Sequence, residues 1–131
     1  MPSRDDGCRL SVVVIVRDEE AHLPVFLSSH DFADEIVLVD GGSRDNTLAI
    51  AAEHPKVVLL QRAWTGFPEQ WNFGIDGARG RWILISEADQ VVSPELRAEI
   101  AAVVADDRED RAFLIPRRNY IGNRWLRHGG W

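Results

Sequence analysis

The chain of 131 residues has the length of one domain, and its 45% hydrophobic and 27% charged residues are typical of a folded globular protein and exclude a disordered one. A single cysteine, Cys8, excludes an internal disulfide and fits a reducing compartment. No apolar run approaches the length of a membrane span, and residues 1–9 lack a signal-peptide pattern. We therefore expect a cytoplasmic protein.

The net charge of −6 at pH 7 is unevenly distributed. Residues 111–131 contain five arginines and no acid, whereas residues 1–110 contain 10 basic and 21 acidic side chains. The acidic body argues against a nucleic-acid partner. The basic end has two interpretations. It meets an anionic substrate or a membrane surface, which would place the protein at the inner face of the membrane by peripheral association, or it is a solvated edge.

Short apolar runs alternate with helix-like segments along the chain. Residues 10–16 are apolar at almost every position, which is typical of a strand buried on both faces. Further strands are predicted at residues 36–39, 57–60, 81–86 and 112–115, and helices up to about residue 29 and at about 46–53, 68–78 and 94–104. This alternation predicts an α/β fold with a mostly parallel sheet and helices on both faces.

Polar residues follow three of the predicted strands, at positions 17–19, 40–43 and 87–89. In parallel α/β sheets, ligands bind outside the carboxyl ends of the strands. We therefore expect these three segments to share one site, in which the Asp40 carboxylate can accept hydrogen bonds from a base or a ribose.

Glu87 and Asp89 are two carboxylates spaced i, i+2 directly after the fourth strand. In an extended chain such side chains point the same way. Two hard oxygen ligands at one strand end suit Mg²⁺ or Mn²⁺ shared with a phosphate. An isolated pair of this kind is more often a solvated strand end, so the interpretation depends on the neighbouring strand ends.

Four segments occur together in one order: residues 12–20 (VVVIVRDEE), residues 39–47 (VDGGSRDNT), Asn72-Phe73-Gly74 with Ala78-Arg79-Gly80, and Glu87-Ala88-Asp89. In order and spacing, over roughly residues 9–105, they resemble the inverting family-2 glycosyltransferases with the GT-A, Rossmann-like fold. Residues 64–72 (WTGFPEQWN), 116–120 (PRRNY) and 127–131 (RHGGW) look like the branch of lipopolysaccharide-core β-glucosyltransferases.

The resemblance implies a metal-dependent transferase in lipopolysaccharide-core or related glycan biosynthesis. Such an enzyme moves a hexose from a nucleoside diphosphate sugar, of the UDP-glucose type, to an acceptor hydroxyl on a glycan or a lipid-linked glycan. A downstream carboxylate deprotonates the acceptor while Mg²⁺ or Mn²⁺ stabilises the leaving diphosphate.

By the same resemblance, Asp40 holds the base and residues 17–19 line its pocket. The implied nucleotide-sugar site consists of Val16, Arg17, Glu19, Asp40, Gly42, Ser43, Gln70, Asn72, Glu87, Ala88 and Asp89. Glu87 and Asp89 match the metal-binding motif, although Glu87 stands where the family usually has Asp, so the metal is held by Asp89 alone or through water.

The family's catalytic base and acceptor half normally lie beyond the position of Trp131. Residues 1–131 are therefore expected to form a single donor-binding domain that transfers sugar negligibly by itself. Two other hypotheses stay open. One is a non-catalytic nucleotide-sugar-binding fragment that needs a missing segment or a partner. The other is a phospho-acceptor signalling domain, which is disfavoured because the only lysine, Lys56, precedes a strand rather than following one.

Overall fold

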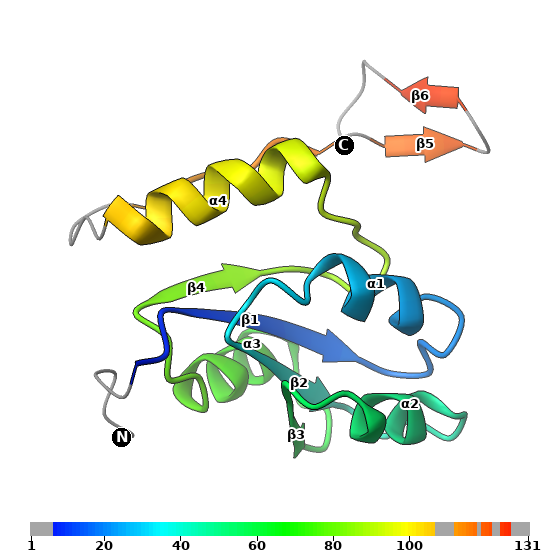
Figure 1. The fold of residues 1–131 in the computed structure, drawn as a ribbon. Coiled ribbons are helices and arrows are strands. Elements are labelled where there is room, and N and C mark those ends of the chain that lie inside the picture. Colours follow the sequence, from blue (N-terminus) through cyan, green and yellow to red (C-terminus); the bar gives the residue numbers. More distant parts are fainter. Residues whose placement is uncertain (1–6, 107–111, 118, 122–123, 127–131) are drawn as a thin grey trace.

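A computed structural model describes residues 7–106, 112–117, 119–121 and 124–126. Strands and helices alternate over its first 106 residues (Figure 1). The elements are β1 (Leu10–Val16), α1 (Leu23–Ser29), β2 (Glu35–Asp40), α2 (Thr47–Glu53), β3 (Val57–Gln61), α3 (Phe67–Asp76), β4 (Trp82–Ile85), α4 (Pro94–Asp106), β5 (Asn119–Ile121) and β6 (Arg124–Leu126). The predicted α/β class is confirmed. None of the described helices has the length and apolarity that a membrane crossing requires.

β1 lies inside a four-stranded parallel sheet of order β3-β2-β1-β4. Val13 lies opposite Val37 of β2 on one side and opposite Ile85 of β4 on the other. Every β1 residue is buried except Ile15, which is partly buried. A strand with neighbours on both edges and helices on both faces has almost no solvated surface, which explains its nearly continuous apolar sequence.

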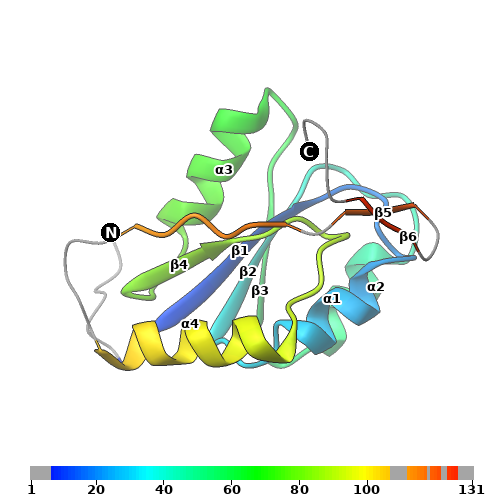
Figure 2. The ribbon, with the colours of Figure 1, turned by 90° about the horizontal axis from the view of Figure 1, so that it is seen from above.

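Alternate side chains of β1 belong to two separate cores. Val12 and Val14 pack with Phe26 of α1 in the core that also receives side chains of α2 and α4. Val13 packs in the other core, to which α3 contributes Ile75. Figure 2 shows α3 on one side of the sheet and α1, α2 and α4 on the other. The predicted helices on both faces are therefore present.

A glycine allows α3 to approach the sheet closely. A Cβ atom added at Gly74 would lie 2.6 Å from Val13 Cγ1 and 3.0 Å from Val39 Cγ2. Carbon atoms at these separations overlap, so a larger residue would force α3 away from the sheet. Packing therefore explains the glycine of the Asn72-Phe73-Gly74 segment.

A buried carboxylate joins three segments at the amino end of the sheet. Glu35 is 1% exposed and accepts hydrogen bonds from Ser11 Oγ at 2.6 Å, from the Arg79 backbone N–H at 2.7 Å and from Arg79 Nε at 3.0 Å. Ser11 Oγ accepts the backbone N–H of Gly80 at 2.8 Å. These bonds satisfy the buried charge and fix the bend before β4, at the edge of the sheet opposite to the predicted site.

His30 joins the end of α1 to the residue that follows β4. Its ring is 0% exposed and stacks on Phe26. Nδ1 lies 2.8 Å from the Phe26 carbonyl oxygen, and Nε2 lies 2.9 Å from Ser86 Oγ. Burial lowers the pKa of His30 below its ordinary value, against the opposing effect of the Phe26 hydrogen bond. The ring is therefore neutral at pH 7.

The strand predicted at residues 112–115 is wrong, because residues 112–117 have no regular secondary structure. The segment nevertheless lies beside β4 and the loop that follows that strand. The rings of Phe113 and Trp82 are 6.0 Å apart, and Arg117 Nη1 lies 3.9 Å from Glu87 Oε2. All six residues are exposed, and Leu114 completely so. The segment therefore buries no apolar face that would stabilise it as a strand.

The antiparallel strands β5 and β6 form a hairpin that the sequence interpretation did not include. The residues between them are Gly122 and Asn123. A Gly-Asn pair between two short apolar segments is a hairpin signal, so this element could have been found from the sequence.

Replacing Gly74 with Ala should lower the free energy of unfolding by about 1–3 kcal/mol, because the added methyl group overpacks the core between α3 and the sheet. Chemical denaturation measures the change. Asn72→Ala, at an exposed position of the same helix, is the control and should change stability by less than about 0.5 kcal/mol. Equal stabilities of the two variants would contradict the close packing.

The lowered pKa of His30 predicts a pH dependence of stability. Below its ordinary pKa of 6.5 the unfolded chain binds a proton that the folded chain resists. The free energy of unfolding is therefore unaffected by this group above pH 6.5 and falls as the pH drops below it, with a slope of at most about 1.4 kcal/mol per pH unit. Denaturation of wild type and His30→Gln between pH 7.5 and 5.5 isolates this contribution, since the carboxylates are common to both. Parallel curves would show that the ring titrates normally.

Candidate functional site

The carboxyl ends of β1, β2 and β4 meet at one edge of the sheet (Figure 1). The chain moves from β1 to β2 and β3 on one side, and then reaches β4 on the other side of β1 through α3. The strand order therefore reverses between β1 and β4. In open α/β sheets, ligands bind outside the strand ends at such a reversal.

The loops after β1 and β2 are tied together by hydrogen bonds in both directions. Asp18 Oδ1 accepts the N–H of Arg44 at 2.7 Å, and Ser43 Oγ accepts the N–H of Asp18 at 2.9 Å. The N–H of Glu19 donates to Thr47 Oγ1 at 2.8 Å. Asp18 adopts a φ of +53°, which is uncommon for a residue other than glycine. We call these two hydrogen-bonded segments, residues 17–20 and 40–47, the platform.

The Asp40 carboxylate accepts hydrogen bonds from the backbone of the turn that follows it. Its side chain is buried at 2% exposure, and its Oδ2 accepts the N–H groups of Gly42 at 2.9 Å and Ser43 at 3.1 Å. Gly42 has a φ of +111°, a backbone conformation that glycine adopts without strain, so the turn after β2 suits this residue. These contacts give Asp40, Gly42 and Ser43 a structural function in the platform. Their predicted contacts with a nucleotide stay a prediction.

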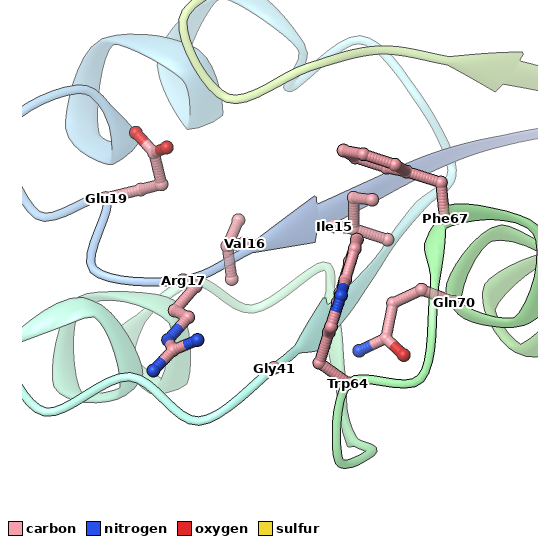
Figure 3. Close-up of a pocket in the computed structure, with 8 residues that line it drawn as sticks. All are labelled: Ile15, Val16, Arg17, Glu19, Gly41, Trp64, Phe67 and Gln70. Atoms are coloured by element: carbon pink, nitrogen blue, oxygen red, sulfur yellow. The ribbon is translucent and has the colours of Figure 1, made fainter.

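A pocket of about 180 Å³ opens between the platform and the start of α3 (Figure 3). Its lining residues are Ile15, Val16, Arg17, Glu19, Gly41, Trp64, Phe67 and Gln70. Pockets for drug-sized ligands usually measure about 300–1,000 Å³. This one therefore has room for a group the size of a base rather than for a whole nucleotide sugar.

The wall contributed by the segment before and within α3 is aromatic. Trp64 and Phe67 form an edge-to-face pair with ring centroids 4.7 Å apart, and they are 45% and 64% exposed. Between them, Gly66 has a φ of +139°, which lets the chain turn sharply into the helix. Gln70 is 1% exposed and is oriented by the bond from its Nε2 to the Arg62 carbonyl oxygen at 2.9 Å. The sequence signal for this wall was the run at residues 64–70.

The opposite wall carries charge. Arg17 is exposed directly after β1, and Glu19 is partly buried and lies 2.9 Å from His22 Nδ1 through its Oε2. The pocket therefore combines a flat apolar surface with one cation and one carboxylate. Such a combination suits a planar, polar ring that carries an anionic group.

Glu87 and Asp89 lie on a turn, so the extended geometry expected from their spacing is wrong. β4 ends at Ile85, and the N–H of Gln90 donates to the Glu87 carbonyl oxygen at 3.0 Å, which closes the turn. Both acids are nevertheless exposed, while Ala88 between them is buried in the core on the α1 side. We call residues 87–90 the acidic turn. The side chain of Ala88 is therefore not available to a ligand.

The donor set of the acidic turn fits a divalent cation in part. Carboxylate oxygens are the ligands that Mg²⁺ and Mn²⁺ prefer, and Mg²⁺ is commonly held by one or two carboxylates together with substrate phosphates. Within the part of the chain that the structure describes, no three His, Cys, Asp or Glu side chains are grouped to hold a metal. Glu87 and Asp89 can therefore hold a cation only if a phosphate and water complete its coordination.

The predicted site residues thus fall into separate groups at one edge of the sheet. The pocket contains Val16, Arg17, Glu19 and Gln70; the platform contains Asp40, Gly42 and Ser43; and the acidic turn contains Glu87, Ala88 and Asp89. Asn72 is exposed on α3 and does not line the pocket. Ile15, Gly41, Trp64 and Phe67 line the pocket without having been predicted as binding residues.

Comparison with curated proteins gives relatives over most of this chain. A TPR repeat-containing protein of Synechococcus elongatus is 39% identical over 111 residues, which are 83% of this chain and 27% of the relative. An uncharacterized glycosyltransferase of Rickettsia felis is 32% identical over 118 residues, covering 85% of this chain and 41% of the relative. The lipopolysaccharide core biosynthesis glycosyltransferase LpsC of Rhizobium meliloti is 28% identical over 116 residues, covering 86% and 43%. The chain thus spans less than half the length of these relatives.

Solved structures share the fold. S. aureus TarS (residues 1–349) matches with a TM-score of 0.66 and 26% identity, over 75% of this chain and 32% of that one. The mannosyltransferase PcManGT of Pyrobaculum calidifontis, solved with GDP-Man and Mn²⁺, matches with a TM-score of 0.61 and 24% identity, over 79% and 34%. The second likeness shows the fold alone.

The order of the sequence motifs, the strand order and these likenesses all agree with the expected GT-A fold. The model of the family described as "Glycosyl transferase family 2" matches residues 11–131, which is most of the chain. The chain belongs to glycosyl transferase family 2.

Proposed function

We propose that the chain binds the donor in an inverting, metal-dependent glycosyltransferase, which moves a hexose from a nucleoside diphosphate sugar of the UDP-glucose type to an acceptor hydroxyl. The observation that carries the proposal is the position of two features at the strand-order reversal. A base-sized pocket lies at the end of β1, and the acidic turn follows β4, the strand that pairs with β1. Membership of family 2 supports transferase chemistry.

In this proposal the base enters the pocket, and the diphosphate extends along the ends of β1 and β4. Arg17, exposed directly after β1, would attract the phosphates. Asp89, with Glu87 directly or through water, would hold Mg²⁺ or Mn²⁺ against the diphosphate. A bound cation would neutralise the charge that develops on the leaving diphosphate. The complex of PcManGT with GDP-Man and Mn²⁺ supports both the ligand class and the cation.

The proposed acceptor is a glycan or a lipid-linked glycan of lipopolysaccharide-core or related biosynthesis. The likeness to LpsC supports this choice. The proposed location is the cytoplasm, where a lipid-linked acceptor would bring the enzyme to the inner face of the membrane by peripheral association.

Asp89→Ala should remove most of the metal-dependent affinity for the donor, a loss of about 2–4 kcal/mol if the cation bridges this carboxylate and a diphosphate. Calorimetry with UDP-glucose and GDP-mannose, in Mn²⁺ and in EDTA, measures that affinity. Asp76→Ala, at an exposed acid of α3, is the matched control and should bind like wild type. Unchanged metal dependence in a folded Asp89→Ala protein would contradict the assignment of the acidic turn. Sugar transfer by residues 1–131 to a lipopolysaccharide-core acceptor would exclude the non-catalytic alternative.

Trp64→Ala should weaken the binding of UDP and GDP by about 1–3 kcal/mol, because the indole offers a flat surface on which a base can stack. Titration followed by intrinsic fluorescence gives a second measurement, since a base stacked on Trp64 quenches its emission. The control is Phe73→Ala, which removes an exposed aromatic ring that does not line the pocket. The pocket is not the base site if both variants keep the wild-type affinity.

A further inference from the structure

We infer that Ser29 and His30 at the end of α1, together with Ser86 and Gln90, are positioning residues that hold the acidic turn in the geometry needed for cation binding. The inference rests on the proposed function, because it concerns the same acidic turn. It adds a second set of residues, none of which was predicted as part of the site from the sequence.

The loop that carries Glu87 and Asp89 contacts the end of α1 twice, once before the acidic turn and once after it. Before the turn, His30 Nε2 lies 2.9 Å from Ser86 Oγ. After the turn, the N–H of Val92 donates to Ser29 Oγ at 3.3 Å. Two consecutive residues of one helix end thus fix the positions at which the loop leaves β4 and continues towards α4.

The hydrogen positions follow from the chemistry of the partners. Nδ1 of His30 faces the Phe26 carbonyl oxygen, which can only accept, so Nδ1 carries the hydrogen of the neutral ring. Nε2 is therefore an acceptor, and the single hydrogen of the Ser86 hydroxyl is shared between Nε2 and Gln90 Oε1. Because the ring is completely buried and stacked on Phe26, it holds Ser86 Oγ in a fixed position between His30 and Gln90.

Gln90 closes the network from inside the turn. Its Oε1 accepts the N–H of Glu87 at 2.9 Å and lies 3.2 Å from Ser86 Oγ. Its own N–H donates to the Glu87 carbonyl oxygen at 3.0 Å. The N–H and the carbonyl oxygen of Glu87 are thus both bonded to Gln90, which also contacts the Ser86 hydroxyl beside His30.

This network also joins the acidic turn to the pocket. α1 begins directly after the platform, where the N–H of Leu23 donates to the Glu19 carbonyl oxygen at 2.9 Å. Glu19 lines the pocket, and His30 follows the last residue of the same short helix. The charged wall of the pocket, to which Glu19 belongs, and the candidate metal ligands are therefore attached to opposite ends of α1.

Among the described residues, no comparable hydrogen bond supports the exposed carboxylates of Glu87 and Asp89. The Glu87 side chain is 59% exposed, and its ion pair with Arg117 spans 3.9 Å between two exposed groups. Such pairs contribute little to fixing a side chain. The orientation of the turn therefore depends on the hydrogen bonds between Glu87 and Gln90 and on the buried contact between His30 and Ser86. Partners that orient metal ligands typically contribute about 10–100-fold to metal affinity.

The test is calorimetry of UDP and GDP binding to wild type and variants, in Mn²⁺ and in EDTA. The quantity compared is the Mn²⁺-dependent gain, which is the affinity in Mn²⁺ divided by the affinity in EDTA. Gln90→Leu, which lacks the acceptor, and Ser86→Ala should each reduce the Mn²⁺-dependent gain about tenfold. Both should leave the affinity in EDTA within about twofold of wild type. Gln90→Glu retains an acceptor oxygen at the same place and should recover most of the gain.

Ser11→Ala is the matched control for Ser86→Ala, since it removes a buried hydroxyl that bonds to Glu35 at the amino end of the sheet. It should destabilise the fold and leave the Mn²⁺-dependent gain unchanged. A readout without ligand is amide hydrogen exchange, in which the Glu87 N–H should exchange about tenfold faster in Gln90→Leu and at the wild-type rate in Ser11→Ala.

The outcomes distinguish a failure of the proposed function from a failure of the positioning inference. If wild type binds each nucleotide with the same affinity in Mn²⁺ as in EDTA, the proposed function is overturned, and with it this role of the network. A wild-type gain that persists in Gln90→Leu and Ser86→Ala would overturn the positioning inference and leave the proposed function intact. A loss of gain that Gln90→Glu does not recover, or that Ser11→Ala reproduces, would show a general effect of stability and would also overturn it.

Discussion

The burial of β1 on both faces and both edges is the constraint on which the rest of the structure depends. Its even and odd residues belong to different cores, so α1, α2 and α4 must cover one face and α3 the other. That division sends the chain to opposite edges of β1, first to β2 and later to β4. The strand-order reversal at the carboxyl end of β1 follows directly, and with it the place where a ligand can bind.

The platform shows how residues with functional-looking chemistry can be used for structure. The carboxylate of Asp18 accepts backbone N–H groups of the neighbouring loop, and the carboxylate of Asp40 accepts those of its own turn. Each such bond satisfies a donor that would otherwise need water, and together the bonds support the positive φ of Asp18. A strained residue persists only where its surroundings determine it, so the platform is a well-supported wall beside the pocket.

Much of the fold could be predicted because local patterns agreed with one another. The apolar run of β1 and the alternation of apolar and helix-like segments up to residue 104 each indicated elements that the structure contains. The strand predicted at residues 112–115 failed because strand formation requires a partner edge and a buried face, and the exposed side chains of Phe113 and Leu114 show that the face is not buried. Local propensity contains no information about either requirement.

The sequence by itself determined the class of fold, the family and the set of strand ends at which the chemistry gathers, because hydrophobic period and motif order are properties of neighbouring residues. Only the tertiary structure decided which of those residues line the pocket. It placed Trp64 and Phe67 in the pocket wall, turned Ala88 into the core and connected His30 to Ser86 across 56 positions of sequence. Such contacts arise from the packing of α1 and α3 on opposite faces of the sheet, and no local pattern in the chain encodes them.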